Sequence, residues 1–191
     1  FGAIDFTRVS IFPLSAFSKQ FDALQMPYLY RDSDHMWKVL NGPIGEEFLQ
    51  SLESANFVGL CWYDSGARNF YNSKREIKSV ADLKGLKIRV QQSDLMMNMV
   101  AALGAVPTPM PFGEVYSALQ TGVVDGAENN WPSYISTSHY EVAKYFTLDE
   151  HTRVPEITIG SKIVMDKLSK EDQALIKKAA KDSMPYQIAE W

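Results

Sequence analysis

The chain has 191 residues, of which 46% are hydrophobic and 22% are charged, and its formal net charge is −4. This is the balance of an ordinary globular protein, and 191 residues can bury a sizeable core in one large domain or two small ones. The acidic balance excludes a basic surface that recruits nucleic acid. A small anionic ligand would therefore have to be bound by local positive charges.

The single cysteine, Cys61, lies in the apolar run NFVGLCWY, which predicts a buried strand. One cysteine allows no intrachain disulfide and no zinc site built on cysteines. No apolar run reaches the length of a transmembrane helix, and no signal peptide is visible. The chain starts with FGAIDFTRVS, which is typical of the inside of a fold, so we expect a fragment of a longer protein.

The first part of the chain predicts short strands and helices in alternation. GAIDFTRVS is typical of a strand followed by a turn. Ser33 is expected to cap a helix that ends at Gly42, and Pro43 is expected in the first turn of the next helix. NFVGLCWYDSG and ARNFYN each predict a strand, and SVADLKG predicts a short helical turn.

Residues 86–130 predict a β-α-β-α-β unit. LKIRV has apolar residues at period two, and Ser93 is expected to cap a helix that ends near Gly104. VPTPMP must be extended, because proline is excluded from helix interiors. A second helix is expected to end at Gly122, and VVDGAENNW predicts a strand followed by a loop. Strands that alternate with helices favour a mostly parallel sheet.

The last part of the chain predicts a strand and a long helix. EITIGSKIVMDKL is typical of a strand, and Ser169 and Asp172 have the spacing of a capping box. The helix that follows is expected to bend or end at Pro185.

Arg89 lies one residue before the end of the strand LKIRV. In open α/β sheets, ligands bind at the edge where such strands end. A guanidinium can hold a carboxylate through two parallel hydrogen bonds, and the helix that begins near Ser93 offers free N–H groups at the same edge. The alternative is a structural arginine paired with a neighbouring Asp or Glu, and the residues alone leave both interpretations open.

DGAENNW, residues 125–131, follows the third strand of the same unit and is expected at the same edge as Arg89. Asn129 and Asn130 carry donors and acceptors that suit a hydroxylated acid. The alternative is an Asx-rich loop that caps its own turns. Arg68 in GARNFYN is a weaker candidate, because an arginine is exposed by default.

Aromatic residues make up 12% of the chain and could form a pocket wall against a sugar face. The candidates for this wall are Phe112, Trp131, Tyr134 and Tyr140. The sequence contains neither a glycine-rich phosphate loop nor a nucleophile elbow, and its three histidines have no metal-ligand spacing. We therefore expect no catalytic residues, no cofactor and no metal.

The sequence resembles the DctP-type solute receptors of TRAP (tripartite ATP-independent periplasmic) transporters through nearly its whole length. The resemblance rests on four segments. They are MPYLYRDSDHMW, DSGARNFYNSKREIKSVADLKGLKIRVQ, ALGAVPTPMPFGEVYSALQTGVVDGAENNWPSY and LSKEDQALIKKAA. The central motif is very specific, whereas DLKGLKIRV also occurs in other periplasmic receptors.

The resemblance implies a periplasmic binding protein-like α/β fold, with two lobes of mostly parallel sheets joined by hinge strands and a long helix, which closes on a small organic acid. Residues 1–65 and 155–191 are expected to form an incomplete lobe I, and residues 66–154 are expected to form lobe II. The chain is expected to cross between the lobes near residues 64–66 and 153–155.

The resemblance also implies roles for single residues. Arg89, in the KIRV segment, corresponds to the arginine that holds the ligand carboxylate. Asn129, in DGAEN, contacts the same carboxylate region, and Arg68, in ARNFYN, is a secondary contact. Phe112, in PMPF, corresponds to a phenylalanine that often lines the pocket.

The segment DGAENNWPSYISTSHYEVAKYF is similar to receptors of this family that take sugar acids, especially hexuronates. A polyol chain needs further hydrogen bonds. Residues that could supply them are Gln91, Asn130, Arg8 and Ser10. The chain departs from the family at both ends: the strand and helix that normally precede GAIDF and the part after the long helix are expected to be missing.

The function implied by the resemblance is that of a periplasmic receptor that delivers an organic acid to TRAP membrane permease subunits, without nucleic acid. Because a fold does not fix a function, an enzyme or a ligand-sensing regulator built on the same binding fold stays an alternative. A receptor for a dicarboxylate or another carboxylate is a further alternative.

Overall fold

The computed structural model describes residues 4–191, and these form two compact units. Unit 1 contains residues 4–24, Tyr30–Ser65 and Val154–Trp191, and unit 2 contains Gln25–Leu29 and Gly66–Arg153. The division predicted from sequence differs at Val154, which it placed in the second lobe, and at residues 25–29, which it placed in the first lobe. These residues pack in unit 2, where the N–H of Tyr28 donates to the carbonyl of His151 at 3.0 Å.

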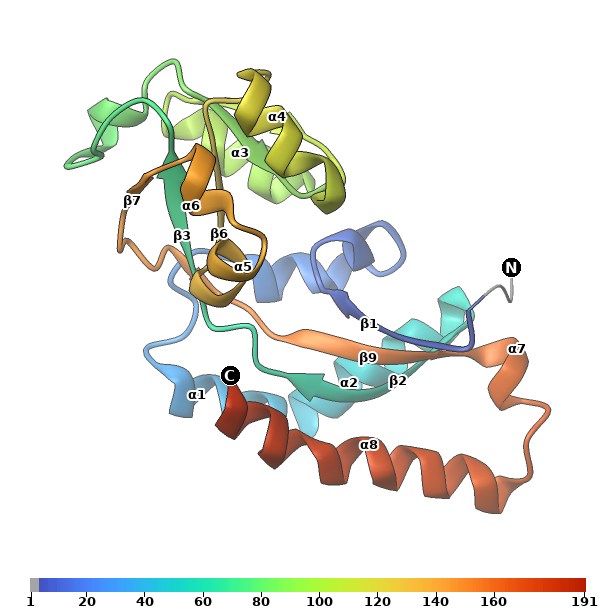
Figure 1. Cartoon of the computed structure of the whole chain (residues 1–191). Helices are drawn as coiled ribbons and strands as arrows, with labels where there is room; N and C mark the ends of the chain where they lie inside the picture. The colour runs from blue at the N-terminus through green and yellow to red at the C-terminus, as the bar shows by residue number, and fades with distance from the viewer. Residues whose placement is uncertain (1–3) are drawn as a thin grey trace. The chain divides into compact units, whose positions relative to one another are not determined.

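Unit 1 is built on a three-stranded antiparallel sheet (Figure 1). Its strands lie in the order β1 (Phe6–Ser10), β9 (Glu156–Ser161) and β2 (Phe57–Tyr63). The central strand, β9, is antiparallel to both neighbours. The chain passes through residues 66–153 of unit 2 between β2 and β9. The two strands are therefore not joined by a single crossover helix, which would favour a parallel pair.

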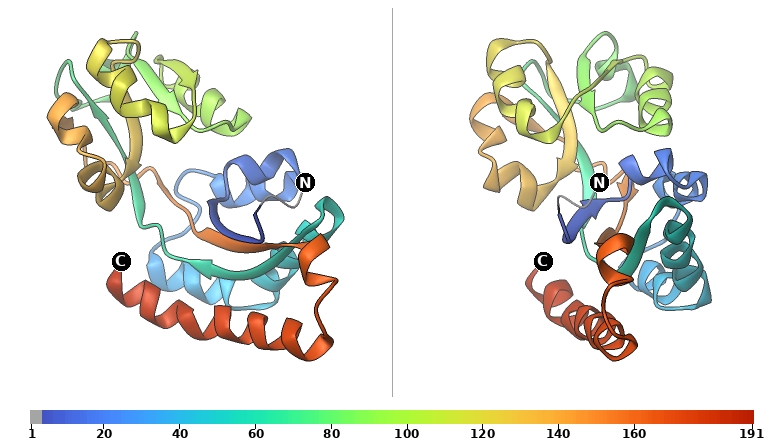
Figure 2. Two further views of the ribbon diagram at one scale, coloured as in Figure 1. Left: turned by 45° about the vertical axis from the view of Figure 1, so that its right-hand side comes forward. Right: turned by 90° about the vertical axis from the view of Figure 1, so that its right-hand side faces the viewer.

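Helices cover both faces of this sheet, as Figure 2 shows. On one face, Ile176 and Ala180 of α8 (Lys170–Glu190) pack against Val58 and Leu60 of β2. On the other face α2 (Pro43–Ser51) approaches so closely that a Cβ added at Gly59 would lie 2.6 Å from the backbone oxygen of Leu49. The remaining helical segments are α1 (Ser33–Leu40), α7 (Lys162–Met165), and three 3₁₀ helices at Pro13–Ala16, Lys19–Gln25 and Leu52–Ala55.

Local signals predict most helix ends in unit 1, with three corrections. Helix α2 begins at Pro43, and Ser169 caps α8, as predicted. The cap of α1 is Asp32 and not Ser33, because the Asp32 carboxylate accepts from the N–H of His35 at 2.7 Å. The strand predicted over 156–168 ends at Ser161 and is followed by α7. Helix α8 continues past Pro185, so of the two predicted outcomes, a bend or an end, the end is excluded.

Unit 2 contains a mixed sheet with the strand order β5-β4-β6-β3-β7, and β8 also pairs with β3. The strands are β3 (Ala67–Asn72), β4 (Lys87–Val90), β5 (Val106–Pro109), β6 (Gly126–Asn130), β7 (Tyr145–Phe146) and β8 (Thr152–Arg153). Among the described residues, only β4 forms parallel pairs, with β5 and with β6. The prediction of mostly parallel sheets is therefore wrong. Only β4, β5 and β6 belong to the expected β-α-β-α-β unit, whose crossover helices allow parallel pairing, whereas β3 pairs antiparallel with β6, β7 and β8.

The sheet of unit 2 is covered by helices on both faces (Figure 2). Helix α3 (Asp94–Ala102), capped by Ser93 as predicted, lies on one face. On the other face lie α4 (Val115–Thr121), α5 (Trp131–Ser136) and α6 (His139–Val142). These three helices pack on Tyr71 and Ala127 to form a hydrophobic core. Short 3₁₀ helices at Val80–Leu83 and Phe112–Glu114 complete the unit.

Candidate functional site

The carboxyl ends of β4 and β6 bring Arg89 and Asn129 to one edge of the unit 2 sheet. The two strands are parallel, with Arg89 opposite Ala127. Both side chains are buried, Arg89 to 3% exposure and Asn129 to 5%. The sequence predicted a loop after the strand in VVDGAENNW, but Gly126–Asn130 is itself the strand, because it is hydrogen-bonded between β4 and β3.

Arg89 is held by a backbone carbonyl and by an aromatic ring. Its Nε and Nη2 both donate to the carbonyl oxygen of Met110, at 3.0 and 2.8 Å. Its guanidinium carbon lies 5.9 Å from the ring centroid of Phe112. Across residues 4–191, no carboxylate lies within the 4.0 Å of an ion pair with Arg89, so the sequence-based alternative of a direct structural ion pair has no partner.

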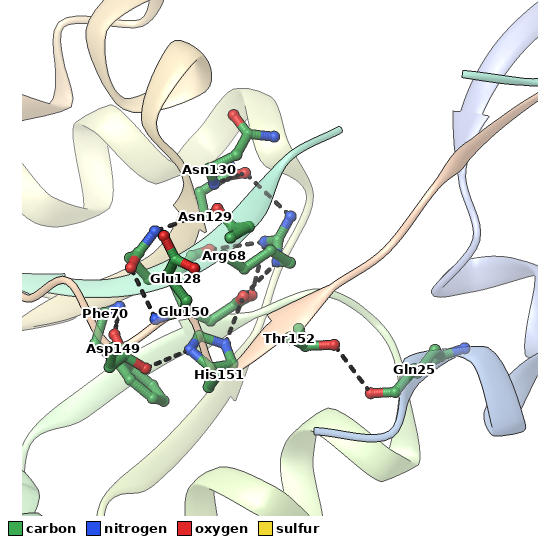
Figure 3. Close-up of polar contacts among 12 residues, drawn as sticks. Gln25, Arg68, Phe70, Glu128, Asn129, Asn130, Asp149, Glu150, His151 and Thr152 are labelled. Atoms are coloured by element: carbon green, nitrogen blue, oxygen red, sulfur yellow. Dashed lines mark hydrogen bonds and ion pairs between the residues drawn. The ribbon is translucent and has the colours of Figure 1, made fainter. Parts of the chain in front are cut away.

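Arg68 forms the direct ion pair that Arg89 lacks (Figure 3). Its Nε and Nη2 donate to the two carboxylate oxygens of Glu128, with a distance of 2.8 Å for Nη2–Oε1. Nη2 also donates to the Glu128 backbone carbonyl at 2.8 Å, and Nη1 donates to Oδ1 of Asn129 at 3.0 Å. Arg68 is only 2% exposed, so the default expectation of an exposed arginine is wrong, because its charge is neutralised inside the unit.

His151 contacts Glu128, and Asp149 contacts His151, so both residues extend this network (Figure 3). His151 Nδ1 lies 2.7 Å from an oxygen of Asp149, and Nε2 lies 3.5 Å from Oε2 of Glu128. Burial opposes charge on His151, but its hydrogen bond to Asp149 and the nearby Glu128 carboxylate outweigh burial and raise its pKa. Burial also opposes charge on Glu128, but Arg68 and His151 lower its pKa to about 2.

Arg68 and Glu128 neutralise each other, whereas Arg89 has no carboxylate within ion-pair distance among the described residues. The raised pKa of His151 favours its charged form beside the carboxylates of Glu128 and Asp149. Burial lowers the pKa of Arg89 from its usual value, and the positive charge of Arg68 acts in the same direction, although Glu128 counteracts both. A guanidinium stays protonated in proteins, so Arg89 provides a buried positive charge suited to an anion.

Asn129 and Asn130, at the end of β6, already have protein partners. Oδ1 of Asn129 accepts from Arg68 and from the backbone N–H of Asn130 at 2.8 Å. Oδ1 of Asn130 accepts from the N–H of Ser133 at 2.8 Å and caps α5. The sequence-based alternative of a self-capping Asn thus describes Asn130.

The other predicted ligand contacts of unit 2 differ in their surroundings. Gln91 directly follows β4 and is partly exposed. Phe112 is 44% exposed next to Arg89. Trp131 is 52% exposed and lies 4.9 Å from the ring centroid of Phe146. Tyr134, a candidate for the aromatic wall, belongs to the hydrophobic core and is 3% exposed.

Arg8 and Ser10 lie on β1 of unit 1. Nε of Arg8 forms an ion pair with Glu156 at 2.8 Å, and its guanidinium lies 5.8 Å from the ring centroid of Trp191. Their contribution to ligand binding stays a prediction.

Sequence reasoning missed Glu128, Asp149 and His151. Glu128 lies within the motif DGAENNW, where an acidic residue beside two asparagines at a strand end could have indicated a polar site. His151 and Asp149 gave no signal, because their partners lie on β3 and β6, far away in the sequence.

Within residues 4–191, no group of three or more His, Cys, Asp or Glu side chains is arranged to hold a metal ion. None of the helices in these residues combines the length and apolar character needed to cross a membrane.

Solved structures of bacterial receptors closely match this chain. A TRAP periplasmic solute-binding protein from Bradyrhizobium sp., in complex with α/β-D-galacturonate, is 57% identical with a TM-score of 0.96, and the match covers 97% of this chain and 62% of that one. A TRAP periplasmic solute-binding protein from Pseudomonas putida F1, with bound D-glucuronate, is 41% identical with a TM-score of 0.96 and covers 100% of this chain and 62% of that one.

A curated relative agrees with these structures. A solute-binding protein of Chromohalobacter salexigens is 40% identical over 190 residues, which cover 100% of this chain and 56% of the relative. The chain therefore spans somewhat more than half the length of these three proteins. The family model for bacterial extracellular solute-binding proteins, family 7, matches residues 1–191. The chain belongs to this family, the DctP family, and has its periplasmic-binding-protein-like α/β fold.

Proposed function

We propose that the protein is a periplasmic receptor that binds a hexuronate through its carboxylate and delivers it to a TRAP membrane permease. The observation that carries the proposal is Arg89, a buried guanidinium at the edge of the unit 2 sheet with no direct carboxylate partner among residues 4–191. Such a group binds an external carboxylate strongly, because the pair forms away from bulk water.

The solved relatives support the hexuronate class. Their ligands include β-D-galacturonate in the protein from Xanthobacter autotrophicus and D-glucuronate in that from Pseudomonas putida. The identity of 57% to the galacturonate-bound protein of Bradyrhizobium sp. makes D-galacturonate the first candidate for this chain. Since these proteins are longer than this chain, ligand contacts outside it are part of the proposal.

Within unit 2, each proposed contact has a separate role. Arg89 holds the carboxylate, and Asn129 contacts it through its amide. Arg68 fixes Asn129 through one hydrogen bond and acts as the secondary contact, because it also donates three hydrogen bonds to Glu128. Phe112 offers an apolar face to the sugar ring, and Gln91 offers hydrogen bonds to its hydroxyls. Asn130 and Trp131 are further candidates for the hydroxyls and the ring.

The protein is proposed to release its ligand unchanged, as a receptor and not as an enzyme. The family supports this, because its members are described as solute-binding proteins. Other carboxylates remain alternatives, since curated relatives include a 2,3-diketo-L-gulonate-binding protein of Escherichia coli and a C4-dicarboxylate-binding protein of Rhodobacter capsulatus.

Calorimetric titration of the full-length protein with a matched panel tests the proposal. The panel contains D-galacturonate, D-glucuronate, D-gluconate, 2,3-diketo-L-gulonate and succinate, with D-galactose as the control that lacks only the carboxylate. We expect the tightest binding for a hexuronate and none for D-galactose. Tighter binding of succinate or of 2,3-diketo-L-gulonate would replace the proposed ligand, and binding of D-galactose equal to that of D-galacturonate would contradict the carboxylate anchor. Release of a chemically altered hexuronate would contradict the receptor function.

A further inference from the structure

His139 is a buried histidine that the proposed ligand contacts do not include. It begins the short helix α6 and is 1% exposed. Its Nδ1 lies 2.8 Å from the hydroxyl of Tyr71, and among the described residues no group forms a hydrogen bond with its Nε2. The preceding residue, Ser138, has a left-handed backbone with φ of 56°. Strained backbone of this kind persists only where the surroundings hold it in place, and it is frequent beside functional sites.

Ring contacts connect His139 to the proposed carboxylate anchor. The imidazole packs edge-on against Phe112, with ring centroids 5.9 Å apart and an interplanar angle of 62°. Phe112 in turn contacts Arg89, whose guanidinium carbon lies 5.9 Å from the centroid of the Phe112 ring. Phe112 is 44% exposed, so His139 is the buried support of a ring that is otherwise half open to solvent.

The backbone next to Phe112 also holds Arg89. Met110, two residues before Phe112, accepts both guanidinium hydrogen bonds through its carbonyl oxygen. Its side chain packs against the hydrophobic core that includes Tyr71. The segment 110–112 therefore contacts Arg89 through a carbonyl and through a ring, and it rests on the core that includes Tyr71 and on His139.

The surroundings of His139 keep it neutral. Burial lowers its pKa to about 4, and the positive charge of Arg89 adds to this effect. The other titratable residues whose rings lie beside its ring are Tyr71 and Tyr116, and the Tyr116 hydroxyl donates to Glu141 at 2.9 Å. A neutral imidazole adds no positive charge that would repel the guanidinium, so Arg89 remains the charged group of this part of the site.

We propose that His139 is a positioning residue for ligand binding: it fixes the ring of Phe112, and through it the segment that orients Arg89. This inference rests on the proposed function, because its effect is measured as affinity for a carboxylate ligand. A group placed by a supporting residue loses binding strength when that support is removed, even though the group itself remains.

A double-mutant cycle in the full-length protein tests this role. We expect His139→Ala to weaken hexuronate affinity by about ten- to hundredfold, the range that loss of orienting partners gives at metal sites. If His139 acts through Phe112, then His139→Ala should change affinity little in a Phe112→Ala background, because the coupled effects do not add. Tyr71→Phe, which removes only the hydroxyl, should weaken binding in the same direction. The matched control is His35→Ala in unit 1, where Nδ1 accepts from the N–H of Arg31, and it should leave affinity unchanged.

The outcomes separate the two proposals. Full additivity of His139→Ala and Phe112→Ala, or unchanged affinity in His139→Ala, would overturn the positioning role. If His139→Ala does not fold, His139→Gln takes its place in the same cycle, because it keeps a polar side chain of similar length. A wild-type protein that binds no hexuronate contradicts the proposed function, whereas additive effects in a protein that binds hexuronate contradict only the role of His139.

Discussion

Arg68 and Glu128 form an ion pair in which each partner is 2% exposed or less. The pair lies on neighbouring strands, since Arg68 is opposite Asn130 and Glu128 is opposite Phe70 in the β3–β6 register. Arg68 also donates to Oδ1 of Asn129. The buried ion pair therefore holds the side chain of a proposed ligand contact in place. Arg89 lies near this pair but shares none of its hydrogen bonds.

Replacement of Arg89 by alanine should reduce ligand affinity and change the stability of the ligand-free protein much less. Loss of one partner of a buried charge pair costs about 2–5 kcal/mol in binding. At about 1.4 kcal/mol per tenfold change, affinity should fall by tens to thousands of fold. Arg89→Lys should recover only part of this loss, because an ammonium lacks the planar fork of the guanidinium.

Calorimetric titration and thermal melts of the same Arg89 variants provide the measurements. The control is Arg75→Ala, since Arg75 also donates to backbone carbonyls, those of Asp82 and Lys84, but is exposed. Unchanged affinity of Arg89→Ala, together with a large loss of apo stability, would show that Arg89 has a structural role.

Replacement of Glu128 by glutamine should destabilise the ligand-free protein by about 3–5 kcal/mol, because it leaves Arg68 buried without its counter-charge. The double variant Arg68→Met/Glu128→Gln should be more stable than Glu128→Gln alone. Urea unfolding at pH 7 measures both differences. Equal stability of the wild type and Glu128→Gln would mean that the negative charge of Glu128 does not stabilise the folded protein.

The contribution of Glu128 should depend on pH. Its pKa is about 2 in the folded protein against an ordinary 4.5, so the unfolded chain binds the proton first as the pH falls. The stability it provides is complete above pH 4.5 and is lost progressively between that pH and pH 2. The stability difference between the wild type and Glu128→Gln should therefore shrink over this window, and a difference that is constant with pH would contradict the assignment.

The two buried histidines of unit 2 should respond to pH in opposite directions. The pKa of His139 is lowered to about 4, so the stability associated with its neutral form is lost as the pH falls from 6.5 to 4. The pKa of His151 is raised, so its stabilising contribution is complete below pH 6.5 and is lost as the pH rises through its folded pKa. Histidine resonances followed by NMR from well below pH 4 up to about pH 9 measure both midpoints, and two midpoints on the same side of 6.5 would contradict this prediction.

A methyl group at Gly126 should disrupt the sheet beside Arg89. A Cβ there would lie 2.3 Å from the backbone oxygen of Tyr71 and 2.8 Å from Cβ of Asn72. Gly126→Ala should cost about 1–3 kcal/mol in urea unfolding, the usual range for overpacking. Gly113→Ala is the control, because a Cβ at Gly113 meets no atom within 4 Å, and it should stay within about 0.5 kcal/mol of the wild type.

Local patterns predicted the elements around Arg89 but not the environment of the other charged residues. Period-two apolar residues and the Ser93 cap predicted β4 and α3, because these signals depend only on near neighbours. The burial of Arg68 could not be predicted in this way, since its partner Glu128 is 60 residues further along the chain. The same holds for His151, whose ring stacks on Phe70 at a centroid distance of 4.5 Å.

The parallel direction of strands was predicted correctly only where helices join them. Strands β4, β5 and β6 follow the expected β-α-β-α-β unit and are parallel. The direction of β9 depends on the chain returning from unit 2 to pair between β1 and β2. Such pairing between distant segments leaves no periodic signal in the sequence.

Every residue of β6 is buried and has a separate structural task. Gly126 permits close approach of β3, Ala127 belongs to the core, and Glu128 neutralises Arg68. Asn129 accepts from that same arginine, and Asn130 caps α5. This strand therefore has no position that can vary freely. If receptors with this fold diversify toward new acids, substitutions should accumulate at exposed neighbouring residues such as Phe112, while the residues of β6 stay unchanged.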